Sequence, residues 1–164
     1  MASPDRANSR TFVVTGVASG IGLATARRLL VEGGTVVGAD LTAAPDLGPE
    51  FTFVRADITD EAAVAEMLAA VPDRLDGVVH AAGVAGGGPV HLLDRAEWDR
   101  VIGINLTGTF LVAKAALARM IEQPRVDGER GSLVTVASIE GIEGTAGGSS
   151  YNAAKGGVVL LTKN

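Results

Sequence analysis

The amino-acid sequence predicts an α/β fold in which a doubly wound parallel sheet is covered by helices on both faces. Strand-like and helix-like segments alternate along the chain, which is typical of parallel strands joined by crossover helices. The strand-like segments are short and rich in β-branched residues. A glycine-rich turn joins the first of them to the first helical pattern, and such turns lie at the ligand-binding edge of α/β sheets.

Five strands and five helical segments are expected. The strands cover residues 11–15, 35–39, 51–55, 75–80 and 132–137. Helical periodicity covers residues 21–32, 61–71, 95–104, 106–121 and 151–162. Gly33 and Gly34 end the first helix, and Thr59 or Asp60 caps the second. The segments 41–50, 85–89, 123–131 and 141–149 are interpreted as loops, and the last of these as mobile because it holds four glycines.

Length and composition indicate one domain over residues 11–164, preceded by a flexible tail of residues 1–10. The 164 residues are 47% apolar and 20% charged, which fits a globular protein. A net charge of −5 without a basic cluster gives no support to nucleic-acid binding. Without a run of 18 apolar residues or an apolar leader, neither a membrane span nor a secretory signal is expected. The chain has no cysteine and no expected metal site, which suits a reducing, cytoplasmic location.

The glycine-rich turn is a candidate dinucleotide site. Gly16, Gly20 and Gly22 are spaced for a turn whose backbone N–H groups approach a pyrophosphate, and the next helix points its positive end at the same anion. The second strand ends at Asp40, eighteen residues after Gly22, where an acidic side chain binds ribose hydroxyls in such sites. An ordinary strand-to-helix turn is the alternative, because the chain holds 22 glycines. The position of Asp40 favours the dinucleotide.

Four polar residues are candidates for catalysis. Ser138 follows the fifth strand, whereas Tyr151 and Lys155 are four residues apart and share one face of the last helix. Asn105 lies between the two helical segments that follow the fourth strand. A neighbouring ammonium stabilises a phenolate, so Tyr151 can exchange a proton with a substrate alcohol while Ser138 bonds the same oxygen. Each residue alone also fits a structural role, as a cap, turn or helix break; the four together favour catalysis, with the hydride exchanged through a cofactor.

With these motifs in place, the chain resembles the short-chain dehydrogenase/reductase family over residues 11–164. The residues that carry the resemblance are Thr15-Gly16-x-x-x-Gly20-Ile21-Gly22, Asn105, Ser138 and Tyr151-x-x-x-Lys155. The resemblance implies a Rossmann-like fold and an enzyme that acts on CH–OH groups with a nicotinamide cofactor. It also implies that Lys155 bonds the nicotinamide ribose and that Asn105 positions a water that relays protons to Lys155.

The same resemblance implies a set of cofactor-binding residues. Asp57 and Ile58 match the family's adenine-contacting pair, and Ala82 and Gly83 match the second half of its N-N-A-G motif. The full set is Gly16, Ser19, Gly20, Ile21, Gly22, Asp40, Leu41, Asp57, Ile58, Ala82, Gly83, Tyr151 and Lys155.

The cofactor expected from this comparison is NAD. A carboxylate at Asp40 accepts hydrogen bonds from ribose hydroxyls and repels a 2′-phosphate. Ser19 and Leu41 stand where NADP-dependent members of the family carry a basic residue. The alternative is that Asp40 only faces solvent.

Two departures from the family pattern are evident. His80 and Ala81 replace the two asparagines of the N-N-A-G motif, and His80 is expected to supply the missing hydrogen bonds in a structural role. Family members also continue through a sixth strand, a substrate-covering segment and a seventh strand. We therefore expect a fragment, with the sheet truncated after the fifth strand and the start of the following helix.

The predicted function is NAD-dependent hydride transfer between a secondary alcohol or ketone and the nicotinamide, with Tyr151 as general acid/base. A non-catalytic dinucleotide-binding or assembly module is the alternative, because the substrate-covering region is missing from the sequence. The resemblance further suggests a homodimer or homotetramer formed through the helices of residues 106–121 and 151–162. A small-molecule substrate is expected, with no nucleic-acid or membrane partner, and the sequence determines neither its identity nor the direction of reaction.

Overall fold

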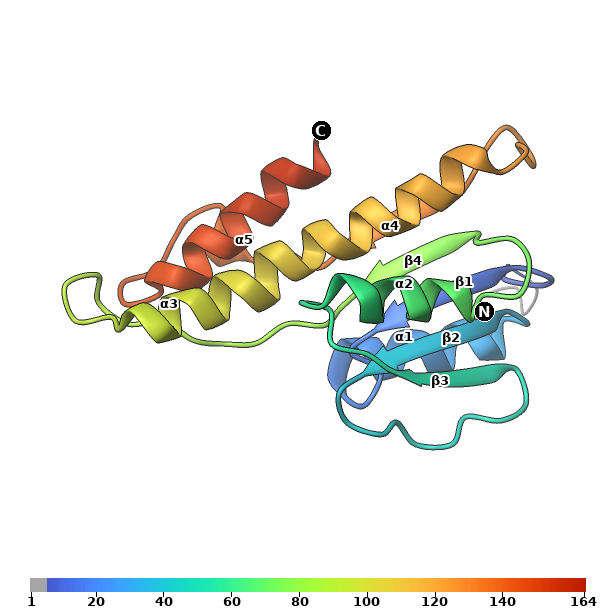
Figure 1. The fold of residues 1–164 in the computed structure, drawn as a ribbon, viewed down its shortest axis with the longest axis horizontal. Coiled ribbons are helices and arrows are strands. Elements are labelled where there is room, and N and C mark those ends of the chain that lie inside the picture. The colour runs from blue at the N-terminus through green and yellow to red at the C-terminus, as the bar shows by residue number, and fades with distance from the viewer. Residues whose placement is uncertain (1–5) are drawn as a thin grey trace.

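The computed structural model describes residues 6–164, and its centre is a five-stranded sheet in the order β3-β2-β1-β4-β5 (Figure 1). All neighbouring strands are parallel. The strands are β1 (Thr11–Thr15), β2 (Thr35–Asp40), β3 (Phe51–Arg55), β4 (Gly77–His80) and β5 (Ser132–Thr135). The order changes direction between β1 and β4, and ligands bind at the carboxyl ends of the strands at such a point. The predicted doubly wound α/β fold is confirmed.

Helices cover both faces of this sheet. They are α1 (Gly20–Val31), α2 (Glu61–Ala69), α3 (Arg95–Ile102), the π-helical turn η1 (Gly103–Thr107), α4 (Gly108–Glu122), the short 3-10 turn η2 (Ile139–Gly141) and α5 (Ser149–Thr162). In Figure 1, α1 lies behind the sheet and α2 lies in front of it, whereas α3, η1 and α4 run on as one long rod. Helix α5 packs against α3, η1 and η2.

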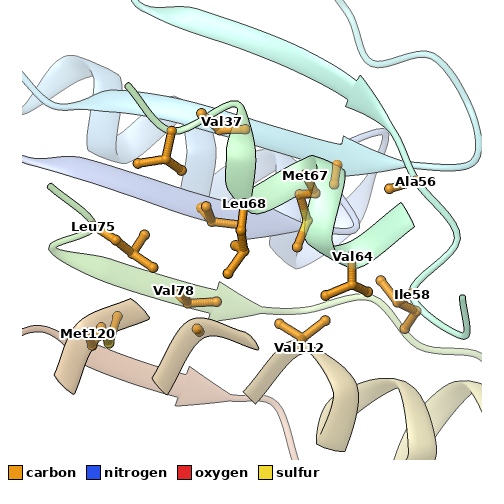
Figure 2. Close-up of a cluster of buried hydrophobic side chains, with 14 residues drawn as sticks. Val37, Ala56, Ile58, Val64, Met67, Leu68, Leu75, Val78, Val112 and Met120 are labelled. Carbon is orange, nitrogen blue, oxygen red and sulfur yellow. The ribbon is translucent and has the colours of Figure 1, made fainter. Parts of the chain in front are cut away.

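The larger hydrophobic core lies between the sheet and helices α2 and α4 (Figure 2). Val37 and Val78 of the strands face Met67 of α2 and Val112 of α4, and each of these side chains is at most 1% exposed. Burying a side chain of this size stabilises the fold by about 1.5–3 kcal/mol.

A smaller core covers the other face. Successive strand residues point to opposite faces, so Val13 enters the larger core while Val14 packs with Val36 and with Ala26 of α1. Alternate positions along β1 are therefore buried on both sides, as expected for a central parallel strand.

The start of β4 differs from the prediction. The expected strand begins at residue 75, but β4 begins at Gly77. The amide side chain of Gln123 accepts a hydrogen bond from the Leu75 N–H at 2.7 Å and donates one to the Leu75 C=O at 3.0 Å. Both backbone groups of Leu75 are thus taken by a side chain rather than by a neighbouring strand.

The break predicted between residues 104 and 106 is a π-helical turn, not an interruption. Gly103–Thr107 continues the helix from α3 into α4 with a wider turn, and Asn105 lies in its middle. The hydroxyl of Thr109 donates to the Asn105 C=O at 2.7 Å. A single π turn inside an α-helix displaces one side chain from the regular helical face, and such turns often mark functional positions.

One helical stretch in the described part of the chain, Arg95–Glu122, is long and apolar enough to cross a membrane by length and composition alone. The prediction of no membrane span considered only uninterrupted apolar runs. Val112, Ala116 and Met120 of this stretch are buried in the core, and core helices of soluble proteins pass the same test. The stretch is therefore weak evidence for a membrane location.

Part of the predicted N-terminal tail can be described. Residues 1–5 lie outside the described residues, whereas residues 6–9 form a turn. Ala7 is 2% exposed, and its N–H donates to the Glu32 C=O at 3.1 Å. This turn therefore packs against the C-terminal end of α1.

Candidate active site

A cavity of about 620 Å³ opens at the carboxyl ends of β1, β2, β3 and β4. Cavities of this size hold cofactors and drug-sized ligands. The predicted cofactor residues that follow these strands all line it: Gly16, Ser19, Gly20, Ile21, Gly22, Asp40, Leu41, Asp57, Ile58, Ala82 and Gly83. They meet because parallel strands place the residues that follow them at one edge of the sheet.

Glycine is required where the turn after β1 approaches its neighbours. Gly16 has φ +74°, and a Cβ there would lie 2.9 Å from the backbone nitrogen of Ala82. A Cβ at Gly22 would overlap the carbonyl oxygen of Gly16. Gly20 has φ +53° and open space beside it, so its backbone faces the cavity uncovered. This cradle, at the N-terminus of α1, fits a pyrophosphate group.

Asp40 borders the cavity from the end of β2. Its carboxylate accepts hydrogen bonds from the Ala18 N–H at 3.1 Å and the Thr42 N–H at 3.0 Å. These two bonds orient the carboxylate and join the glycine-rich turn to the end of β2. Among the described residues that line the cavity, none is lysine or arginine.

His80 supplies the hydrogen bonding expected of it. It pairs with Thr15 in the register of β1 and β4, and its Nδ1 lies 2.9 Å from the Thr15 hydroxyl oxygen. That oxygen also accepts a hydrogen bond from the Ala82 N–H at 3.1 Å. Which of the two groups donates in the bond between the Thr15 hydroxyl and Nδ1 depends on the imidazole tautomer, and the buried Nε2 has no hydrogen-bond partner among the described residues. Burial, and secondly the charge of Lys155, lower the pKa of His80 to about 4.

Helix α5 carries Tyr151 and Lys155 on one face. Lys155 is only 6% exposed, and its Nζ donates to the Val136 C=O at 2.6 Å. The same Nζ lies 5.7 Å from the centroid of the Tyr151 ring, within cation–π distance. Burial lowers the pKa of Lys155. The amine of Lys155 is thus held close to the ring of Tyr151.

Asn105 is buried in the π-helical turn, next to Val84, which lines the cavity. Its Nδ2 donates to the Val84 C=O at 2.9 Å, and its Oδ1 accepts from the Val84 N–H at 3.1 Å. A Cβ on Gly83 would lie 2.7 Å from Asn105 Oδ1 and 3.7 Å from Lys155 Nζ. Asn105 and Lys155 therefore lie next to Gly83, which lines the cavity, although neither of them is itself a lining residue.

Ser138 lies three residues after β5, which ends earlier than the predicted residue 137, and directly precedes η2. Its Oγ accepts a hydrogen bond from the Glu140 N–H at 3.2 Å. This bond leaves the Ser138 hydroxyl hydrogen available to donate to another oxygen. The turn that carries Ser138 packs against α5, the helix that carries Tyr151.

The structure adds site residues that sequence reasoning missed. Ala39, Ala56, Thr59 and Ile104 also line the cavity, and Val84 holds Asn105 through its backbone. Thr59 could have been found from its position two residues after Asp57. Ala39, Ala56, Ile104 and Val84 are apolar, and they contribute to the site through their backbone or carbon atoms. Apolar residues of this kind form no recognisable motif in the sequence.

Comparison with known proteins identifies the family. The sequence model described as short chain dehydrogenase matches residues 10–164. The chain belongs to the short-chain dehydrogenase/reductase family. It is 44% identical to cis-4-hydroxycyclohexanecarboxylate dehydrogenase of Sinomonas cyclohexanicum, over 94% of this chain and 65% of that protein. It is 37% identical to 3-hydroxyacyl-CoA dehydrogenase type-2 of Bos taurus, over 92% of this chain and 64% of that protein.

A solved structure agrees with this assignment. Levodione reductase superimposes with a TM-score of 0.87 and 38% identity, covering 97% of this chain and 66% of the reductase. The chain thus spans just under two thirds of the length of these relatives. A member of an oxidoreductase family with this cavity is expected to bind a nicotinamide dinucleotide.

Proposed function

We propose that this chain carries the cofactor site and the proton-transfer residues of an NAD-dependent oxidoreductase that interconverts a secondary alcohol and a ketone. Membership of the short-chain dehydrogenase/reductase family supports oxidoreductase chemistry on CH–OH groups. The observation that carries the proposal is the placement of Lys155 Nζ, 5.7 Å from the Tyr151 ring and beside Gly83 at the cofactor cavity.

NAD is the proposed cofactor because of Asp40. Its carboxylate borders the cavity at the end of β2, where the ribose of the adenosine half binds in sheets of this class. A 2′-phosphate would add close to two negative charges beside it. Ser19 and Leu41, which flank this region of the cavity, supply no positive charge to offset that repulsion.

The proposed chemistry assigns one task to each residue. A bound nicotinamide supplies the hydride acceptor or donor. The phenol oxygen of Tyr151 accepts the proton of the alcohol in oxidation and returns it in reduction. Lys155 stabilises the phenolate by its charge, and the free hydroxyl hydrogen of Ser138 bonds the substrate oxygen as negative charge develops there. Asn105 holds the Val84 segment in place and faces Lys155 across Gly83.

Tyr151→Phe tests this proposal, since it removes the proton-accepting oxygen and keeps the ring. Reduction of NAD by a panel of secondary alcohols should fall by about 10²–10⁴-fold. The NADH dissociation constant should stay within about threefold, and NADH should bind the parent at least about tenfold more tightly than NADPH. Equal turnover by parent and variant would refute the role of Tyr151.

A non-catalytic dinucleotide-binding module is the second candidate. One relative, 42% identical over 74% of this chain, is named inactive 2-(S)-hydroxypropyl-CoM dehydrogenase 2, so the family includes members without that activity. NADH binding by a parent protein that reduces no carbonyl compound and oxidises no alcohol would favour this reading.

We also propose that the chain associates with a second copy through α4 and α5. Phe110, Leu117 and Ile121 recur along one side of α4 and are 47–63% exposed, and Leu160 of α5 is 69% exposed. Contact with a symmetry mate would cover these apolar side chains.

A further inference from the structure

The segment between Ser138 and Tyr151 is held by side-chain hydrogen bonds despite its four glycines. The Thr145 hydroxyl donates to Glu140 Oε2 at 2.9 Å. The Asn152 Nδ2 donates to the Thr145 C=O at 2.8 Å. Thr145 is therefore the middle of a three-residue relay that joins η2 to the first turn of α5.

The relay ends next to two of the proposed catalytic residues. Glu140 is two residues from Ser138, and its own N–H donates to Ser138 Oγ at 3.2 Å. Asn152 directly follows Tyr151 in α5. A displacement at Thr145 is thus transmitted within one or two residues to the serine hydroxyl and to the phenol.

Gly148 allows the relay to close. A Cβ at this position would lie 2.5 Å from Asn152 Oδ1, 2.8 Å from Thr145 Oγ1 and 2.9 Å from Glu140 Oε2. The three oxygen atoms therefore surround the space that any other residue's side chain would fill. The backbone completes the turn, because the Gly148 N–H donates to the Thr145 C=O at 3.2 Å and the Gly148 C=O accepts from the Asn152 N–H at 2.7 Å.

A second close contact fixes the other side of the same turn. A Cβ at Gly141 would lie 2.5 Å from the carbonyl carbon of Lys155 and 2.6 Å from its oxygen. The end of η2 thus rests directly on the backbone of α5. The segment therefore contacts α5 at two places, at Lys155 through Gly141 and at Asn152 through Thr145.

We propose that Thr145, acting through Glu140 and Asn152, is a positioning residue that sets the Ser138 hydroxyl against the Tyr151 phenol. This inference rests on the proposed function, because it assigns both groups to one substrate oxygen. Thr145 itself is exposed, so its hydrogen bond contributes little to global stability. Catalysis is far more sensitive, since a misplacement of about 1 Å costs about 10²-fold in rate.

The test compares Thr145→Val, which keeps the shape and removes the donor, with Thr145→Ser, which keeps the donor. Thr35→Val is the matched control, because the Thr35 hydroxyl donates the same kind of bond, to Glu50 Oε2 at 3.0 Å. Thr35 lies at the start of β2, at the end of that strand away from Asp40 and the cavity. Thr145→Val should lower kcat about tenfold while the NADH dissociation constant stays within about twofold. Thr145→Ser should recover kcat to within about threefold of the parent, and Thr35→Val should leave it unchanged. A Thr145→Val enzyme with parental kcat, or a Thr145→Ser enzyme as slow as Thr145→Val, would overturn the proposal.

Amide hydrogen exchange provides a readout that needs no substrate. The Gly144 N–H donates to the Glu140 C=O at 3.1 Å, and the Gly148 N–H donates to the Thr145 C=O. Both amides should be protected in the parent and exchange at least about tenfold faster in Thr145→Val, but not in Thr35→Val. Unprotected amides in the parent would refute the relay. Another outcome is a parent protein that turns over no alcohol while Thr145→Val still exchanges these amides faster than the parent does. That result would support the relay and contradict the proposed function.

Discussion

Acid should destabilise this protein through one buried side chain, His80. Burial, and secondly the charge of Lys155, lower its pKa from 6.5 to about 4. The unfolded chain therefore binds more protons than the folded chain between these two values. The stability that neutral His80 contributes is fully present above pH 6.5 and is lost as the pH falls through about 4. The loss reaches about 3 kcal/mol at its limit and about 2 kcal/mol at pH 5.

Urea-induced unfolding at pH 7 and pH 5 measures this loss. His80→Asn keeps an amide group that can pair with the Thr15 hydroxyl but has no titrating group. Between the two pH values, the parent should lose about 2 kcal/mol more unfolding free energy than His80→Asn. His91→Asn, at an exposed position, controls for the removal of a histidine and should keep the parental loss. If His80→Asn loses as much stability as the parent, acid acts through other groups and the assignment of a buried neutral imidazole is wrong.

Two further predictions use matched pairs of variants. Gly22→Ala should weaken NADH binding at least about tenfold in a fluorescence titration, because its Cβ would overlap the Gly16 carbonyl oxygen. The control is Gly103→Ala, where a Cβ has open space beside it in a helical turn. This variant should leave NADH binding unchanged and raise the unfolding free energy by about 0.5–1 kcal/mol. Arg119→Met should lower the unfolding free energy by about 2 kcal/mol in urea, because Arg119 donates to three backbone carbonyl groups at and beyond the C-terminal end of α2. Arg125→Met, at an exposed position, should change the unfolding free energy by less than about 0.5 kcal/mol. Equal effects of the two substitutions would show that the three hydrogen bonds of Arg119 contribute nothing to stability.

Local patterns were sufficient to predict the sheet and its helices. The opposite faces of Val13 and Val14 follow from strand geometry, and two glycines end α1 near the predicted position. The start of β4 could not be predicted, because Leu75 is bonded by Gln123 from 48 residues away. A contact between residues so far apart in the chain has no signature in a window of neighbouring residues.

The candidate site divides in the same way. Motif spacing and the family resemblance were sufficient to predict most of the residues that line the cavity, because the ends of parallel strands meet at one edge of the sheet. Tyr151 and Lys155, also predicted to bind the cofactor, are not among the lining residues. The bond from Lys155 to the Val136 C=O was not predictable, because a backbone acceptor has no residue identity. The glycines of the segment 141–149 predict mobility, yet hydrogen bonds through Thr145 join it to α5. The number of glycines predicts a flexible backbone, but it does not predict which side chains form hydrogen bonds in the space beside Gly148.

The cofactor cavity and the proposed catalytic residues are held in place by different kinds of contact, and both lie next to Gly83. The cofactor half is set by backbone packing, since the turn at Gly16 rests on the backbone of Ala82. The half proposed to be catalytic is set by side chains of η1 and α5, where Asn105 and Lys155 are buried. Gly83 directly follows Ala82 and lies against both of these side chains. Because a Cβ at Gly83 would lie 2.7 Å from Asn105 Oδ1, the absence of a side chain there lets the lining of the cavity pack directly against the proposed proton-transfer residues.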